Sequence, residues 1–75
     1  MPKDIVEYIV KALVDKPGLV VITEKKDGPR VLLEIKVDEG DLGKVIGKGG
    51  ATIKSIRAVV GIITKDRNLF VDIAK

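Results

Sequence analysis

Two residue types that dominate catalytic and metal sites are absent, because the chain of 75 residues contains neither cysteine nor histidine. Without cysteine, no disulfide can staple the fold, and no thiolate can act as a nucleophile or a metal ligand. This usage is compatible with a reducing compartment. Without histidine, acid–base chemistry would have to rest mainly on carboxylates. We therefore expect neither a cofactor nor a metal centre.

Long apolar runs are missing as well. No stretch approaches the roughly 18 residues needed to span a bilayer. The first ten residues, MPKDIVEYIV, carry acids where a signal peptide would not. We therefore expect a cytoplasmic protein without a membrane segment. Because 45% of the residues are apolar, the chain can fill one thin core, and we expect a single domain over residues 1–75.

Acidic residues are absent from one central segment. No Asp or Glu occurs from Leu42 to Lys65, although acids crowd on both sides of these residues. The segment carries the cations Lys44, Lys48, Lys54, Arg57 and Lys65. The net charge of +3 is modest, but this distribution predicts a local positive field, which favours polyanions. The alternative at this point is an ordinary solvated surface.

Hydrophobic periodicity predicts three helices and three strands. Helical spacing covers residues 4–15, a short stretch at 38–47 with Asp41 as its expected N-cap, and residues 51–60. Alternation predicts strands at 19–25, 31–37 and 69–74, with turns at KDGP and TKDRN. The order α-β-β-α-α-β indicates an α+β domain in which three helices cover one face of a three-stranded sheet.

The same periodicity predicts which side chains face the core. In the first helix the expected stripe is Ile5, Ile9, Ala12 and Leu13, widened by Val6, Val10 and Val14. In the last helix it is Ile53, Ile56, Val59 or Val60, and Ile63. In the second strand one face carries Val31, Leu33, Ile35 and Val37.

Five glycines fall between Gly40 and Gly50, although glycine is costly to order on folding. A Walker loop needs four residues between its glycines and a Ser or Thr after the lysine, and this chain has neither. A dinucleotide fingerprint needs a third Gly or Ala where Thr52 stands, directly after a strand. The remaining interpretation is a G-x-x-G corner between two short helices, running from Gly47 to Gly50.

Such a corner would let a sugar-phosphate strand approach the backbone closely. The amides of Ala51 and Thr52, at the start of the second helix, would face the anion with the helix dipole behind them. Lys48 at the tip would contact a phosphate directly. The alternative is a plain helix-turn-helix corner, but the lysine-bearing, acid-free flank favours phosphate binding.

The stretch VIGKGGATIKSIR resembles the signature of KH domains, in which Ile-Gly-x-x-Gly-x-x-Ile carries a loop that clamps single-stranded nucleic acid. The residues on that pattern are Val45, Ile46, Gly47, Gly50 and Ile53. The element order resembles the type II arrangement. Essentially the whole chain is similar to a family of small bacterial KH-domain proteins, KH protein A, proposed to act as RNA chaperones. It departs at Gly49, which makes the loop more flexible and less basic than Lys or Arg would.

The resemblance implies a binding site that grips about four nucleotides by their backbone. The RNA-binding residues implied are Lys44, Val45, Ile46, Gly47, Lys48, Gly49, Gly50, Ala51, Thr52, Lys54 and Arg57. Val45 and Ile46 would form the helix side of an apolar groove, Ile35 or Val37 would lie near its other wall, and Ile53 would anchor the core. The turn EKKDGPR would be the variable loop, which adds Lys25, Lys26 and Arg30.

Aromatic residues are scarce. Only Tyr8 and Phe70 are present, and neither is near the loop in sequence, so stacking worth about 1–3 kcal/mol per base is not expected to dominate. This disfavours an RRM or an aromatic OB-fold surface. We expect short, weak, backbone-led recognition. If roughly three or four phosphates are neutralised, the affinity should fall with salt at a logarithmic slope of about −2 to −3.

Protein partners are also expected. Helices on one face of the sheet would leave Leu32 and Phe70 on the open face, and an edge strand could pair with another chain. We expect a homodimer or a complex with a second KH-domain protein. The family resemblance further implies a second bacterial KH protein as partner and a role in RNA-level control, including control of cell-envelope growth and cell shape.

Two other function classes stay open. One is a structural assembly module whose loop binds nothing. The other is a small metal-dependent, phosphate-handling enzyme that holds magnesium through Asp38, Glu39 and Asp41. For these acids we favour a helix cap and a solvated turn. We therefore expect a binding domain rather than an enzyme.

Overall fold

The central feature is a mixed three-stranded sheet. In the computed structural model, which describes residues 2–74, β1 (Val21–Asp27) and β2 (Arg30–Lys36) form an antiparallel hairpin. β3 (Leu69–Ile73) pairs in parallel with β2, so the order is β1-β2-β3 and both outer strands are edges. β1 begins two residues later than predicted because Pro17–Leu19 form a single 3₁₀ turn, η1, instead of extended chain.

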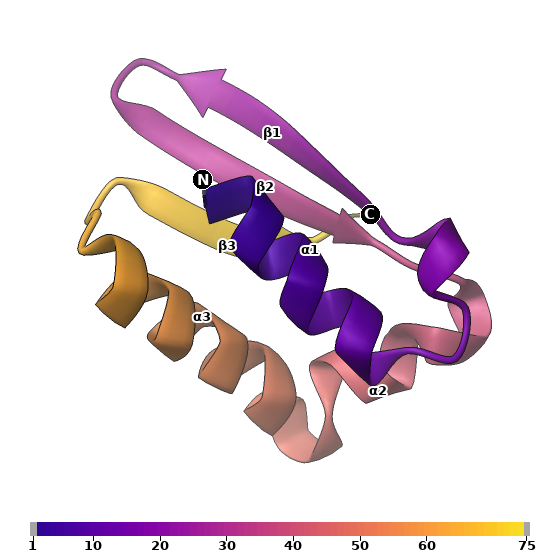
Figure 1. Cartoon of the computed structure of the whole chain (residues 1–75). Helices are drawn as coiled ribbons and strands as arrows, with labels where there is room; N and C mark the ends of the chain where they lie inside the picture. The colour runs from indigo at the N-terminus through magenta and orange to yellow at the C-terminus, as the bar shows by residue number, and fades with distance from the viewer. Residues whose placement is uncertain (1, 75) are drawn as a thin grey trace.

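Three helices cover one face of the sheet (Figure 1): α1 (Pro2–Leu13), α2 (Leu42–Ile46) and α3 (Ala51–Thr64). The predicted α+β fold with the order α-β-β-α-α-β is confirmed. Single 3₁₀ turns, η2 (Glu39–Asp41) and η3 (Lys48–Gly50), flank α2. α2 is shorter than the predicted 38–47, since the chain before it forms η2 and Gly47 ends it with a positive φ.

The core lies between the sheet and the two long helices. β2 contributes Leu33 and Ile35, both fully buried, which confirms the predicted alternation of that strand. α1 buries Val6 and Val10, and α3 buries the residues Ile53, Ile56 and Val60. Within residues 2–74, no helix combines the length and apolar composition that crossing a bilayer requires.

The predicted inward stripes are shifted around both long helices. In α1, Val6 and Val10 form the buried centre, whereas Leu13 is exposed. In α3, Val60 rather than Val59 is buried, and Ile63 is 55% exposed, contrary to prediction. Each helix has more apolar side chains than one packed face can bury, so periodicity alone could not tell which of them the sheet covers.

Candidate nucleic-acid interface

The corner between α2 and α3 is built on three glycines with positive φ angles. Gly47, Gly49 and Gly50 have φ values of 76°, 64° and 77°, a region that L-residues with side chains rarely adopt. The Gly47 amide donates to the Gly43 carbonyl at 2.9 Å and ends α2. The Gly50 amide donates to the Gly47 carbonyl at 3.1 Å and closes the turn.

These glycines meet different surroundings. A Cβ on Gly47 would lie 2.8 Å from the backbone nitrogen of Thr52, so the chain approaches itself too closely there for any side chain. A Cβ on Gly49 or Gly50 would meet nothing within 4 Å. The outer side of the corner is therefore bare backbone that a ligand can approach.

The amides behind the corner are partly used within the protein. The Ala51 N–H donates to the Lys48 carbonyl, so the prediction that this amide faces an anion is wrong in this structure. Lys48 lies at the exposed tip of the loop, and Lys54 is exposed one turn into α3. Among residues 2–74 neither ammonium group has an ion-pair partner within 4 Å, which leaves both available to a phosphate.

Two other predicted cations are held by acids that the fold brings in from outside the acid-free segment. Lys44 forms an ion pair with Asp15 and lies 3.8 Å from a carboxylate oxygen of Asp41. The hydrogen bond to Asp15 raises the pKa of Lys44. Arg57 donates through Nε to the Val71 carbonyl at 2.7 Å and through Nη2 to Asp72 at 3.2 Å. The positively charged surface around the loop therefore includes fewer unneutralised side chains than the acid-free segment of sequence predicts.

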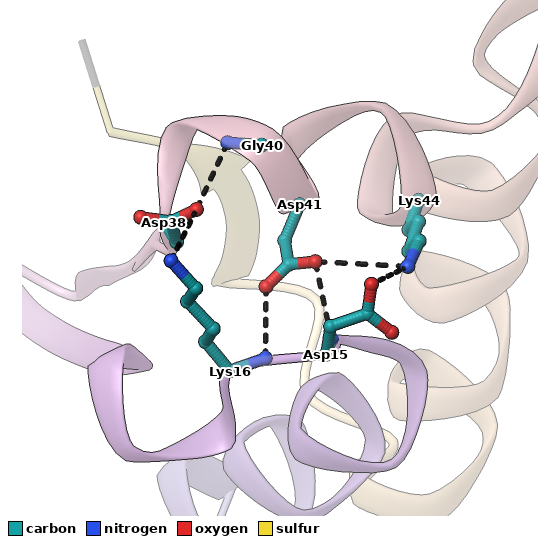
Figure 2. A network of polar contacts seen from close by, with 6 residues as sticks. All are labelled: Asp15, Lys16, Asp38, Gly40, Asp41 and Lys44. Atoms are coloured by element: carbon teal, nitrogen blue, oxygen red, sulfur yellow. Dashed lines mark hydrogen bonds and ion pairs between the residues drawn. The ribbon is translucent and has the colours of Figure 1, made fainter.

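Asp41 is the buried centre of a polar network beneath α2 (Figure 2). Its side chain accepts hydrogen bonds from the backbone amides of Asp15 and Lys16, at 3.1 and 3.0 Å. The residue is only 2% exposed. The Asp15 amide is the largest cause that lowers the pKa of the Asp41 carboxyl, burial opposes it, and the Lys16 amide and Lys44 add to the lowering. The carboxylate thereby fastens the start of α2 to the chain after α1.

This network corrects the role predicted for the acids before α2. Asp41 makes no side-chain cap on α2, whereas the Asp38 carboxylate caps η2 by accepting from the Gly40 amide at 3.1 Å. Lys16 lies 3.8 Å from Asp38. Within residues 2–74 there is no group of three His, Cys, Asp or Glu side chains that could hold a metal ion.

A groove of about 620 Å³ runs between α3 and the open edge of β3. Arg57, Gly61 and Val71 lie along it, and Phe70 lines it from the sheet. The sequence pattern did not predict this wall, because Phe70 is far from the loop along the chain. The alternation of residues 69–74 was the available signal, since it places Phe70 on the face opposite Val71.

The predicted groove walls are partly wrong. Val45 is fully buried, so its side chain does not form a groove wall, whereas Ile35 and Val37 line a depression together with Leu42 of α2. Ile46 and Val37 are half-buried and keep some accessible surface. Ile53 is buried in the core, as predicted.

The hairpin cations Lys25, Lys26 and Arg30 lie far from the glycine corner. The Val31 amide bonds to the Asn68 carbonyl at 2.8 Å, so the hairpin tip lies near the start of β3, beyond the end of α3. The loop lies at the other end of this 14-residue helix (Figure 1), about 20 Å away along its axis. Two of the cations are paired nearby: Lys25 with Glu34 at 2.7 Å, and Lys26 with Glu24 at 3.9 Å. Arg30 lies over the ring of Phe70.

Comparison with known proteins gives consistent matches over most of the chain. A family model described as "KhpA/KhpB, KH domain" matches residues 3–73. A Clostridium perfringens protein named RNA-binding protein KhpA is 44% identical over 73 residues, covering 95% of this chain and 97% of the relative. Proteins with the same name from Chlamydia trachomatis and Aquifex aeolicus are 45% and 43% identical, covering 85% and 81% of this chain and 83% and 77% of the relatives.

A solved structure supports the fold. The crystal structure of a single-residue variant of Aquifex aeolicus Era bound to GDP.AlF4- aligns with a TM-score of 0.60 and 21% identity, over 97% of this chain and 30% of the Era chain. At this identity the likeness concerns the fold alone. The sequence relatives are named for RNA binding and not for a reaction, in agreement with our prediction of a binding domain rather than an enzyme. The chain belongs to the KhpA/KhpB KH-domain family.

Proposed function

We propose that this protein binds short single-stranded RNA through the corner from Gly47 to Gly50. The observation that carries the proposal is the bare, left-handed backbone at Gly49 and Gly50, with the exposed side chains of Lys48 and Lys54 beside it. The names of the relatives support RNA as the ligand.

In this proposal the backbone of the ligand runs over the corner. Gly49 and Gly50 admit the sugar-phosphate chain because they offer no side chain, and Lys48 and Lys54 neutralise its phosphates. Ile46 provides apolar surface beside the loop. Thr52, in the first turn of α3, packs against Gly47 and holds the loop in place. The bases then extend along the first turns of α3 toward the near end of the groove between α3 and β3, where Arg57 lies.

The biological role that we propose is that of an RNA chaperone or post-transcriptional regulator in the cytoplasm. Few phosphate contacts and one short loop favour weak, rapidly exchanging binding, which suits a protein that holds RNA briefly. Such a domain gains affinity when a second KH-domain protein binds the same RNA, because the second contact becomes intramolecular. An influence on cell shape would follow from the RNAs bound.

Charge reversal at the loop tip tests the proposal. We expect Lys48→Glu to lower affinity for a short single-stranded RNA by about tenfold or more, since it replaces an attraction to phosphate with a repulsion. Lys3→Glu is the matched control, because it changes the net charge equally at an exposed position on α1. Equal effects of the two changes, or none for Lys48→Glu, would favour an assembly module whose loop binds nothing.

A further inference from the structure

One row of side chains crosses the face of the sheet that points away from the helices. Leu33 and Ile35 of β2 are buried in the core, so Leu32 between them lies on the opposite face. In the register of the sheet, Leu32 is directly opposite Lys25 of β1 and Phe70 of β3. Phe70 is 48% exposed, and Leu32 is half-buried. We call Leu32 and Phe70 the sheet platform.

Positive charge surrounds the sheet platform. The two residues line a cleft of about 470 Å³ together with Lys25, Lys26 and Arg30. Asp27 lines it as well, so three cations face one acid there. Lys25 and Lys26 are paired with acids, as described above. Among residues 2–74, however, no carboxylate lies within 4 Å of the guanidinium of Arg30, which leaves this group available to an anion.

Arg30 and Phe70 together offer flat surfaces to a ligand. The guanidinium of Arg30 lies 5.9 Å from the centre of the Phe70 ring. This separation is close to the outer limit of about 6 Å for a cation–π contact, and such contacts are weak at an exposed site, so a ligand can displace the guanidinium. Nucleobases stack both on aromatic rings and on guanidinium planes. The guanidinium also carries donors that match a phosphate.

We propose that the sheet platform is a second RNA contact of this protein, separate from the glycine corner. One base of a single-stranded RNA stacks on Phe70, and Arg30 binds the adjoining phosphate. An acidic peptide is the other polyanion that such a rim would attract. The pairing of a ring with a planar guanidinium favours a base, because a carboxylate side chain would use the charge but not the ring.

The sheet platform is continuous with the groove between α3 and β3. Leu32 and Phe70 line both the groove and the cleft, so the surface passes around the free edge of β3. The glycine corner lies about 20 Å away, at the other end of α3. A stacked strand rises about 3.4 Å per nucleotide, so this distance takes roughly six nucleotides. An RNA of about twelve nucleotides therefore reaches both contacts, whereas one of about four does not.

This course of the RNA rests on the proposed function, because it starts at the glycine corner. The contact at the sheet platform makes separate demands on the sequence, since it needs the ring of Phe70 and the charge of Arg30 and not the glycines. The two proposals can therefore be tested with different substitutions and different RNA lengths.

Removal of the ring is the first test. In titrations with labelled RNAs of about four and about twelve nucleotides, we expect Phe70→Leu to lower affinity for the longer RNA by about fivefold or more, because stacking is lost while apolar surface remains. Affinity for the shorter RNA should stay unchanged. Phe70→Tyr keeps a ring and should bind both RNAs as the wild type does. Thermal melts followed by circular dichroism establish that the variants fold.

Removal of the cation is the second test. We expect Arg30→Gln to weaken binding of the longer RNA and to reduce its logarithmic salt slope by about 0.7, as one fewer phosphate is neutralised. Lys36→Gln is the matched control. It removes the same charge from the same face of β2, at the other end of the strand, and should leave the slope unchanged.

The remaining outcomes contradict the second contact. It is overturned if Phe70→Leu binds the longer RNA as tightly as the wild type, or loses affinity equally for both lengths. The effect of Lys48→Glu on the shorter RNA tests the proposed function alone, so the two proposals fail separately. Shifts of the Leu32 and Phe70 amides in ¹H–¹⁵N spectra with an oligoglutamate peptide, but not with the longer RNA, would assign the sheet platform to an acidic protein instead.

Discussion

At the scale of single residues, the glycines of the corner differ in what they do. Glycine is required at position 47 for two reasons. Its φ angle is positive, and Thr52 occupies the place that a side chain would take. Gly49 and Gly50 are required by φ only and face open space. The first is thus a structural glycine, and the other two form the surface offered to a ligand.

Substitution of Gly47 should lower the free energy of unfolding, whereas substitution of Gly61 should not. We expect Gly47→Ala to destabilise the protein by about 1–3 kcal/mol through backbone strain alone, with a further loss from displacement of Thr52. Gly61→Ala is the control within α3: its Cβ meets open space, and it should stabilise by about 0.5–1 kcal/mol. Urea unfolding of both variants measures the difference. Equal stabilities would show that the close approach at Gly47 is not maintained in solution.

Asp41 should make stability depend on pH. Its folded-state pKa is lowered, so its carboxylate contributes stability above the unfolded pKa of about 3.9 and loses it as the pH falls through the lower folded value. Asp41→Asn removes the anion and one of two acceptors for the Asp15 and Lys16 amides. We expect this variant to be clearly less stable than wild type at pH 7 and to differ less as the pH falls below 4.

Urea unfolding at a series of pH values tests this dependence. Asp38→Asn serves as the control, because the Asp38 side chain is more exposed, accepts the Gly40 amide within a local turn and pairs with Lys16 at 3.8 Å. A stability difference for Asp41→Asn that stays constant down to the most acidic pH would contradict the account.

At the scale of elements, sequence periodicity predicted the type and order of every helix and strand, because local pattern determines them. It placed their ends less well. α2 is only five residues long, since the 3₁₀ turn at Glu39–Asp41 and the positive φ of Gly47 limit it on both sides. Periodicity also could not assign which apolar stripe of α3 faces the sheet, and it took the exposed Ile63 for a core residue.

The sequence predicted the geometry of the glycine corner, but not which of the neighbouring cations pair with acids. The glycine corner and the exposure of Lys48 follow from local sequence. The capture of Lys44 by Asp15 and of Arg57 by Asp72 joins residues far apart in the chain, so an acid-free stretch of sequence could not reveal it. For the same reason the contribution of β3 to the groove was missed.

Lys48 and Arg57 should therefore differ in their effect on RNA binding. We expect Lys48→Gln to reduce the logarithmic salt slope by about 0.7, as one fewer phosphate is neutralised. Arg57→Gln should leave the slope nearly unchanged, because the guanidinium is held by Val71 and Asp72. Titrations of single-stranded RNA at several salt concentrations make the comparison. A larger change for Arg57→Gln would place the phosphate path along α3 instead of over the corner.

At the scale of the whole molecule, positive charge is divided between two ends. Lys48 lies at the loop, and the hairpin cations lie beyond the other end of α3, two of them paired with acids. In the proposed binding mode one short RNA would meet about two cations that have no ion-pair partner among residues 2–74, Lys48 and Lys54. The sequence predicted that roughly three or four phosphates would be neutralised. The net charge of +3 therefore says nothing about how many cations a ligand at the loop can reach.

The wild-type salt dependence should be correspondingly shallow. With about two phosphates neutralised per domain, we expect a logarithmic slope of about −1 to −2 for a short single strand. Titration with an RNA of about four nucleotides keeps one molecule from reaching both ends of the domain. A slope steeper than about −3 would mean that the paired cations also bind phosphate.

The most direct test of the central claim is a chemical-shift map. In ¹H–¹⁵N spectra of the labelled protein, titration with a short single-stranded RNA should shift the amides from Gly47 to Ala51 first and most strongly. Smaller shifts should follow in the first turns of α3, at Thr52 and Lys54. Shifts confined to the hairpin tip or to α1, with the amides of Lys48 and Gly49 unmoved, would contradict the account.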